Sequence, residues 1–323
     1  MPIGSGAVYQ AANITAPPTS IYNDDDILIF TPTAPMTDVY MNGAGWQSSN
    51  IDRCDFTTWP ITSAGFSVPV PTNYVLPNEP GTPNNAGGIL LADGQTLSQF
   101  SPVQRCTAGG PVTYTNEFGG AQGTLAPNGN LYTDGIWGAH GSRLSAVGGT
   151  IRLGELIPGN SPIVSGVNDV MRHSLKFEFT GLFDSFGYGP FWPATNADGG
   201  NEGLLVALLP TFNYNGLQTA PGRSIAWTLI NYGAYLVDNP NWNATGICME
   251  KSTMTLNGVI MSAADEFQAN WGYSVYQYQN NTPWLQDLEI IVSNLQVITN
   301  NGPNSIGGGG TPRQPLLPPV TPP

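Results

Sequence analysis

Charged side chains are scarce in this 323-residue chain. Asp, Glu, Lys and Arg make up 10% of the residues, against roughly 25% in an ordinary soluble domain. Lysine occurs only at Lys176 and Lys251, and 22 acidic residues against 9 basic ones give a net charge of −13. A chain this acidic repels phosphate backbones, so its charge argues against nucleic acid as a partner.

Long apolar runs are also lacking. No stretch reaches the roughly 18 apolar residues that a membrane span needs, so we expect no span. The start, Met1-Pro2-Ile3-Gly4-Ser5, lacks the basic and apolar regions of a signal peptide, so a secreted form would have lost its signal already. Asn, Thr, Ser and Gly supply the polarity instead of charges. That balance favours an extracellular protein, secreted or on the cell surface, over a cytosolic one.

Cysteine is limited to three residues. Cys54 and Cys106 each follow an arginine between turn-rich segments, and we predict a disulfide between them in an oxidising compartment. Cys248 is left over and is expected to be a buried thiol. No CxxC or HxxxH spacing occurs, so the sequence predicts neither a metal site nor a cofactor.

Short apolar stretches bounded by turn residues predict strands at 27–30, 66–70, 88–91, 150–156, 172–180 and 203–209. Proline and capping residues predict three helices: Pro221–Tyr232, a short one from Ser262 to Gly272, and one opened by Thr282-Pro283. Residues 107–130, rich in Gly, Asn and Thr, are expected to form a long loop. The predicted fold is mostly β, a jelly-roll-type sandwich with a few short peripheral helices.

The chain ends in glycines followed by prolines. Such a composition predicts a flexible joint and then a stiff spacer. We therefore expect one β-sandwich domain at 1–303, followed by a linker or tail at 304–323 to which a further module or anchor could be attached.

The strongest candidates for chemistry are Glu155, His173 and Asp238. Strand periodicity places His173 on the buried face with Leu175 and Phe177, while Arg172, Ser174, Lys176 and Glu178 share the other face. The same alternation puts Glu155 on an apolar face, where desolvation raises a carboxyl pKa. Asp238 follows an apolar run and stands at a predicted strand end. The three could perform acid–base catalysis. Alternatively, His173 is a hydrogen-bonded core residue and Glu155 forms a buried Glu–Arg or Glu–His bridge.

Candidate substrate-binding residues lie mainly in loops. A glycine-rich segment brings together Asp134, Trp137, His140 and Arg143, and Trp137 could stack on a sugar ring. Trp192, Trp242 and Arg152 are further candidates, since exposed aromatics beside polar groups suit sugars. The alternatives are a plain surface loop and core tryptophans. Asp24-Asp25-Asp26 lacks the spacing of a calcium loop and is interpreted as a solvated cap or turn.

Several segments, considered together, resemble a family of secreted bacterial β-sandwich proteins. They cover most of residues 83–312 and are Pro83-Asn84, 91–97 (LADGQTL), Gln104-Arg105-Cys106, 138–141 (GAHG), 144–156 (LSAVGGTIRLGEL), 172–175 (RHSL), 232–238 (YGAYLVD) and 300–312 (NNGPNSIGGGGTP). The family often has His-Gly-Gly-Ser-Gly where this chain has His140-Gly-Ser-Arg143. The resemblance draws attention to His140, Glu155, His173 and Asp238 but implies no particular reaction.

These observations lead to two functional hypotheses. The first is a secreted carbohydrate-active enzyme, a glycoside hydrolase or polysaccharide lyase that acts on an extracellular polysaccharide or oligosaccharide. The second is a non-catalytic glycan-binding module or an extracellular structural or assembly protein. Convergence of Glu155, His173 and Asp238 within about 10 Å, roughly the upper range for paired catalytic carboxylates, would favour the enzyme.

Overall fold

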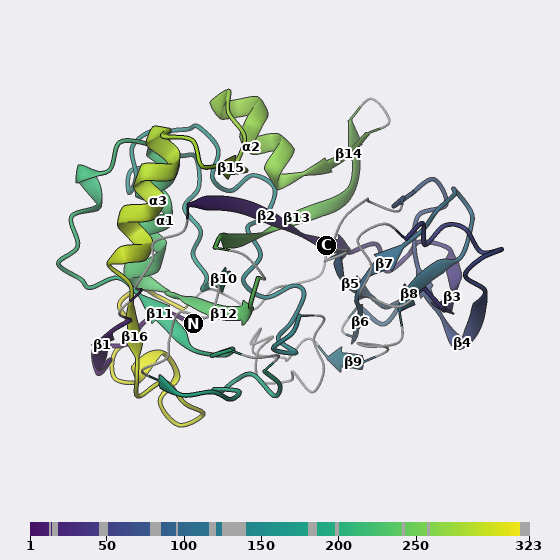
Figure 1. Cartoon of the computed structure of the whole chain (residues 1–323), viewed down its shortest axis with the longest axis horizontal. Coiled ribbons are helices and arrows are strands. Elements are labelled where there is room, and N and C mark those ends of the chain that lie inside the picture. Colours follow the sequence, from purple (N-terminus) through teal and green to yellow (C-terminus); the bar gives the residue numbers. More distant parts are fainter. Residues whose placement is uncertain are drawn as a thin grey trace. The chain divides into compact units, whose positions relative to one another are not determined.

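The fold is described from a computed structural model (Figure 1), in which strands far outnumber helices. It describes residues 1–12, 14, 19–44, 51–77, 85–94, 96–115, 121–124, 140–179, 186–197, 200–240, 243–256 and 259–316. The predicted mostly β class is confirmed. Instead of the predicted single domain, the chain divides into two compact units. Within the described residues, the first unit contains Met1–Asp24, Gly148–Glu250 and 262–316, and the second contains Asp25–Val147 and Lys251–Met261.

The first unit is built on one mixed sheet. Its strands follow the order β1-β16-β11-β12-β10-β13-β2, and β15 pairs with β2. The bounds are β1 Tyr9–Ala11, β2 Ser20–Ile29, β10 Leu175–Phe179, β11 Leu205–Ala207, β12 Ala234–Asp238, β13 Thr245–Leu256, β15 Gln277–Tyr278 and β16 Gln296–Ile298. Residues 25–29 of β2 and 251–256 of β13 belong to the second unit.

Three α-helices accompany this sheet at the predicted positions: α1 Ala220–Asn231, α2 Ala263–Trp271 and α3 Pro283–Ser293. Each begins at a hydroxyl residue whose side chain accepts a backbone N–H: Thr219, Ser262 and Thr282. Such caps satisfy donors that the first turn leaves free. Gly272 ends α2 in the left-handed region at φ 77°, which glycine adopts without cost. Two short 3₁₀ turns, η2 Tyr214–Gly216 and η3 Ile306–Gly308, also belong to this unit.

Helices α1 and α3 lie side by side in Figure 1 and pack on one face of the sheet. One hydrophobic core holds residues of α1, α2, α3 and the strands, including Ile225, Trp284, Leu288, Phe177 and Ile247. The α3 side chains that enter this core include Leu285, Leu288 and Ile291, which lie along one stripe of the helix. The opposite face of β10 and β13 is described below as the candidate site.

The second unit contains two groups of strands. One follows the order β2-β5-β6-β9, with β14 paired to β13, and the other is a separate four-stranded sheet, β4-β3-β8-β7. The bounds are β3 Met36–Asn42, β4 Ile61–Pro69, β5 Ala86–Leu90, β6 Thr96–Phe100, β7 Val103–Gln104, β8 Val112–Thr115, β9 Ala121–Thr124 and β14 Val259–Ser262. The predicted Cys54–Cys106 disulfide is confirmed, and Cys248 is a buried free thiol as expected.

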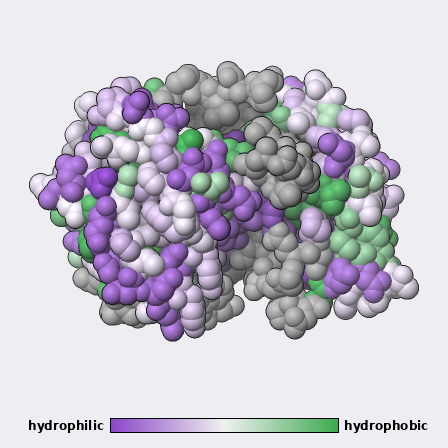
Figure 2. All heavy atoms as spheres, turned by 90° about the horizontal axis from the view of Figure 1, so that it is seen from above, coloured by the Kyte–Doolittle hydropathy of each residue, from purple (hydrophilic) through white to green (hydrophobic). Residues whose placement is uncertain are grey.

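Parallel pairs distinguish these sheets from the antiparallel strands of a jelly roll. Strand β10 runs parallel to β12, β2 to β5, and β3 to β8. The structure therefore confirms a mostly β fold with two sheets and a few short helices, but not the jelly-roll order. Among the described residues, no helix is long and apolar enough to cross a membrane. On the face seen in Figure 2, strongly hydrophilic residues stand among paler ones and a few hydrophobic ones.

Three local predictions are corrected. Residues 150–156 form turns, with only a bridge between Ile151 and Met249. Strands β8 and β9 lie inside the predicted 107–130 loop. The described part of the predicted tail packs on the first unit rather than forming a linker: Arg313 donates to the carbonyl of Ile230, and Gly307 lies against Pro2. Glycine fits there because a Cβ at position 307 would stand 2.5 Å from the Pro2 carbonyl oxygen.

Candidate functional site

Strand β10 is buried on both faces. Leu175, Phe177 and Phe179 enter the hydrophobic core, as the period-two pattern predicted. Lys176 and Glu178, which the same pattern assigned to an outward face, are 0% and 1% exposed. Periodicity thus identified which side chains share a face, but the polar face is covered too. A buried charge is costly unless it is compensated, so the groups that surround these two side chains matter to the fold.

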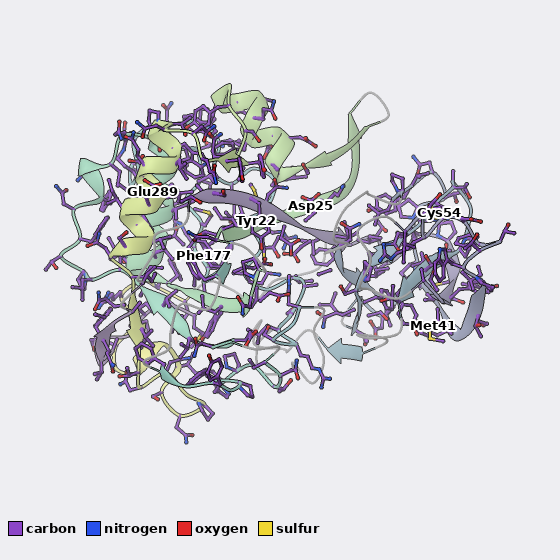
Figure 3. All side chains as sticks on the ribbon, in the orientation of Figure 1. Tyr22, Asp25, Met41, Cys54, Phe177 and Glu289 are labelled. Atoms are coloured by element: carbon purple, nitrogen blue, oxygen red, sulfur yellow. A yellow bond between two sulfur atoms is a disulfide. The ribbon has the colours of Figure 1, made fainter. Side chains whose placement is uncertain are left out.

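Neighbouring strands add more polar side chains to this face of the sheet. Strands β10, β13 and β2 are adjacent, and β12 flanks β10 on its other side. Figure 3 labels Tyr22 on β2 and Phe177, the β10 residue that enters the hydrophobic core. We call the set the polar face, and its members are Tyr22, Asp24, Lys176, Glu178, Asp238 and Cys248.

The centre of the polar face is a hydrogen bond from the Tyr22 hydroxyl to Oε2 of Glu178. Burial raises the pKa of Tyr22 well above its usual value, and the charges of Glu178, Asp24 and Asp238 raise it further. The phenol therefore stays protonated and donates. Gly246 makes room for the pair, because a Cβ at this position would stand 2.6 Å from Tyr22 Cζ and 2.7 Å from Glu178 Oε2.

Two further groups stand close to Glu178. The Cys248 Sγ lies 3.9 Å from Glu178 Oε1, and ligand atoms of Asp24, Glu178 and Cys248 all lie within 4.8 Å of one another. Asp238 is the register partner of Glu178 on the parallel strand β12. It ends that strand and is only partly buried, so the polar face reaches solvent at this edge. The arrangement offers a pair of neighbouring carboxylates, one buried and one accessible.

Glu155 and His173 lie together elsewhere in the same unit. The imidazole Nε2 stands 3.2 Å from both Glu155 carboxylate oxygens, and Nδ1 stands 3.0 Å from the Ser174 carbonyl oxygen. Because both ring nitrogens face acceptors, this geometry suits the doubly protonated ring. Burial alone would lower the pKa of His173, but the charge and hydrogen bonds of Glu155, with the Ser174 carbonyl, raise it above 6.5.

Backbone N–H groups of the 151–156 loop bind further carboxylates. Those of Arg152, Leu153 and Gly154 donate to Glu155, Glu250 and Glu266 respectively. The Arg152 side chain also donates through Nε to Glu250 at 2.8 Å. Such charge-assisted bonds hold the loop in place. The Glu–His bridge that the sequence offered as the structural alternative is present, although it fixes a turn rather than a strand.

The predicted catalytic set does not converge. Asp238 pairs with Glu178 near the end of β10, whereas His173 precedes the start of that strand at Leu175. The strand between Leu175 and Glu178 alone spans about 10 Å. Glu155 and His173 are therefore partners of one another, and Asp238 belongs to the polar face.

His140 was expected in a surface loop and is instead 3% exposed. In the second unit its Nε2 lies 3.0 Å from Oδ1 of Asp26, which is completely buried. Asp24 and Asp26 both lie inside β2, which corrects the predicted solvated cap or turn. Arg143 follows in this loop, has a φ of 60°, and donates its N–H to the His140 carbonyl.

Only some of the remaining sugar-binding candidates lie in the described part of the chain. Asp134, Trp137 and Trp242 lie outside the described residues. Trp192 is partly buried, and its carbonyl accepts a hydrogen bond from Asn301. Arg152 is committed to Glu250, as described above.

Sequence reasoning missed Tyr22, Asp24 and Glu178. One signal was available: strand-like Ile27-Leu28-Ile29 directly follows Asp24-Asp25-Asp26, and a strand extended backwards would carry the acids into the sheet. No protein-family model, curated protein or solved structure matches this chain.

Proposed function

We propose that this chain is an extracellular carbohydrate-active enzyme, a glycoside hydrolase or polysaccharide lyase, whose working residues belong to the polar face. The proposal rests mainly on the pairing of Glu178 and Asp238 on adjacent strands, with the Tyr22 hydroxyl hydrogen-bonded to Glu178. Two facing carboxylates are the usual requirement for cleaving a glycosidic bond. This pair replaces the set of Glu155, His173 and Asp238.

The two carboxylates have different surroundings, as two catalytic roles require. Glu178 is buried, and the Tyr22 hydroxyl fixes the orientation of its carboxylate. Asp238 stands at the partly exposed end of β12 and suits proton exchange with substrate or water. Asp24, Glu178 and Asp238 place three carboxylates on this face, so repulsion favours neutral sugars over uronates.

An extracellular setting is part of the proposal. The Cys54–Cys106 disulfide is of the kind that persists in oxidising compartments. The abundance of Asn, Ser, Thr and Gly in place of charged residues points the same way.

The test is product release from a panel of neutral and acidic polysaccharides, followed by new reducing ends and by unsaturated products. We expect activity on a neutral polymer, and a loss of at least about 100-fold in Asp238→Asn. Asp169→Asn is the matched control, because Asp169 is an exposed aspartate of the same unit. Equal activity in the two variants would contradict the role of Asp238. Glycan binding without product from the wild-type chain would favour a non-catalytic module.

A further inference from the structure

Three adjacent strands of the first unit bring different metal-binding groups together. Asp24 comes from β2, Cys248 from β13 and Glu178 from β10, and their ligand atoms lie within 4.8 Å of one another. The three residues are 5%, 0% and 1% exposed. Close carboxylates alone, or a thiol alone, would mean little. Here a fully buried thiol is directed at one of two buried carboxylates.

The orientation of Glu178 leaves one of its oxygens facing the thiol. Oε2 accepts the Tyr22 hydroxyl, while Oε1 lies 3.9 Å from Cys248 Sγ. A tetrahedral zinc ion with bonds of about 2.1 Å to oxygen and 2.3 Å to sulfur holds such donors about 3.6 Å apart. The separation present is therefore close to what a bound ion requires. A ligating carboxylate oriented by a hydrogen bond is also the common arrangement at metal sites.

The oxygen and sulfur donor atoms of this group indicate which metal ion fits. Calcium and magnesium prefer oxygen ligands only, whereas a thiolate beside carboxylates suits zinc and its spectroscopic substitute cobalt. Local charge favours a cation as well, since Asp24 and Glu178 lie together and Asp238 is the register partner of Glu178. Gly246 keeps the space beside Glu178 clear of a Cβ.

We propose that Asp24, Glu178 and Cys248 bind one divalent transition-metal ion, with zinc as the best match. Binding displaces the thiol proton to solvent as the metal–sulfur bond forms, and no oxidation is involved. The consequence for activity rests on the proposed function: a metal bound to Glu178 would compete with substrate for that carboxylate, so zinc would inhibit. Binding itself is independent of any substrate.

The first experiment titrates the metal-free full chain with Co²⁺ in the absence of substrate. We expect one equivalent to produce a thiolate-to-cobalt charge-transfer band that Zn²⁺ displaces and a chelator removes. Cys248 is the one free cysteine when the disulfide is intact, so the band reports on this residue alone. A folded wild-type chain without the band would overturn the proposal, and would leave the polysaccharide test unaffected.

Substitutions of the proposed ligands test where the metal ion binds. We expect Cys248→Ser to lose the band, Asp24→Asn to bind at least tenfold more weakly, and Tyr22→Phe to bind roughly 10–100-fold more weakly. Glu289→Gln is the control, because Glu289 lies on α3 in the same unit and is labelled in Figure 3. A band that persists in Cys248→Ser would contradict the assignment. If that variant fails to fold, the rate at which methyl methanethiosulfonate modifies Cys248 in the wild-type chain is measured with and without zinc instead. We expect zinc to slow the modification, and an equal rate would overturn the proposed site.

Discussion

Carboxylates cluster at two sites in the first unit, the 151–156 loop and the polar face, and their surroundings differ. In the 151–156 loop, Glu155 accepts the Arg152 N–H and faces the imidazole of His173, while Glu250 accepts from Arg152 and Leu153. On the polar face, Glu178 faces a phenol and a thiol and stands beside Asp24 and Asp238.

Under the proposed function, the difference separates a structural role from a functional one. A carboxylate surrounded by N–H donors and cations gains charge-assisted bonds and stabilises the loop that supplies them. A buried carboxylate grouped with others raises the energy of the folded state, and such groupings persist mainly where function needs them. We therefore assign the structural role to Glu155 and His173, and the working role to Glu178 and Asp238.

The largest expected effect is on catalysis by Glu178→Gln. An amide cannot act as a nucleophile or base, so kcat should fall by about 10²–10⁴ on whichever polysaccharide the wild-type chain cleaves. Steady-state kinetics measure this, with Glu289→Gln beside it as the matched substitution on α3. Activity within twofold of wild type in Glu178→Gln would contradict the catalytic role that distinguishes Glu178 from Glu155.

Gly246→Ala tests how tightly the polar face is built. The added Cβ would collide with Tyr22 and Glu178, and forced overpacking of this kind costs about 1–3 kcal/mol. Urea unfolding should show that loss. Gly302→Ala is the control, because a Cβ at 302 would meet only the Ser305 hydroxyl at an ordinary 3.7 Å. A loss no greater than that of the control would mean that the polar face is loosely packed.

The smallest expected effect concerns pH and the Glu155–His173 pair. Since the folded state raises the pKa of His173, the pair contributes its full stability below the ordinary histidine value of about 6.5. That contribution is lost as the pH rises through the folded-state pKa. His173→Gln should therefore be less stable than wild type by up to about 1 kcal/mol at pH 5.5, and the difference should shrink by pH 9. Unfolding midpoints at both values check it; a difference that grows with pH would contradict the sign.

Local sequence signals predicted local structure well. The helices begin where Thr219, Ser262 and Thr282 can cap them, and α2 ends at Gly272, because caps and left-handed glycines act within one turn. The Cys54–Cys106 disulfide and the strand end at Asp238 were likewise predicted from nearby residues.

Burial of a strand face by segments that are distant in the sequence could not be predicted in the same way. Alternation along 172–180 correctly separated Phe177 from Glu178, but a period of two does not reveal whether the second face is covered. Glu155 was assigned a strand face, yet its neighbours form turns that depend on Glu250 and Glu266, far away in sequence. The partners of Glu178 come from β2, β12 and β13, whose order no single segment encodes.

The most direct test of this account compares the unfolding free energies of Glu178→Gln and Glu155→Gln with that of wild type in urea at pH 7. At position 178 an amide oxygen can still accept from Tyr22, and the substitution removes one of several neighbouring carboxylates, so we predict that stability is unchanged or increased. At position 155 the amide loses the charge that binds His173 and the Arg152 N–H, so we predict a loss of about 1 kcal/mol or more. A loss in Glu178→Gln equal to or larger than that in Glu155→Gln would contradict the account.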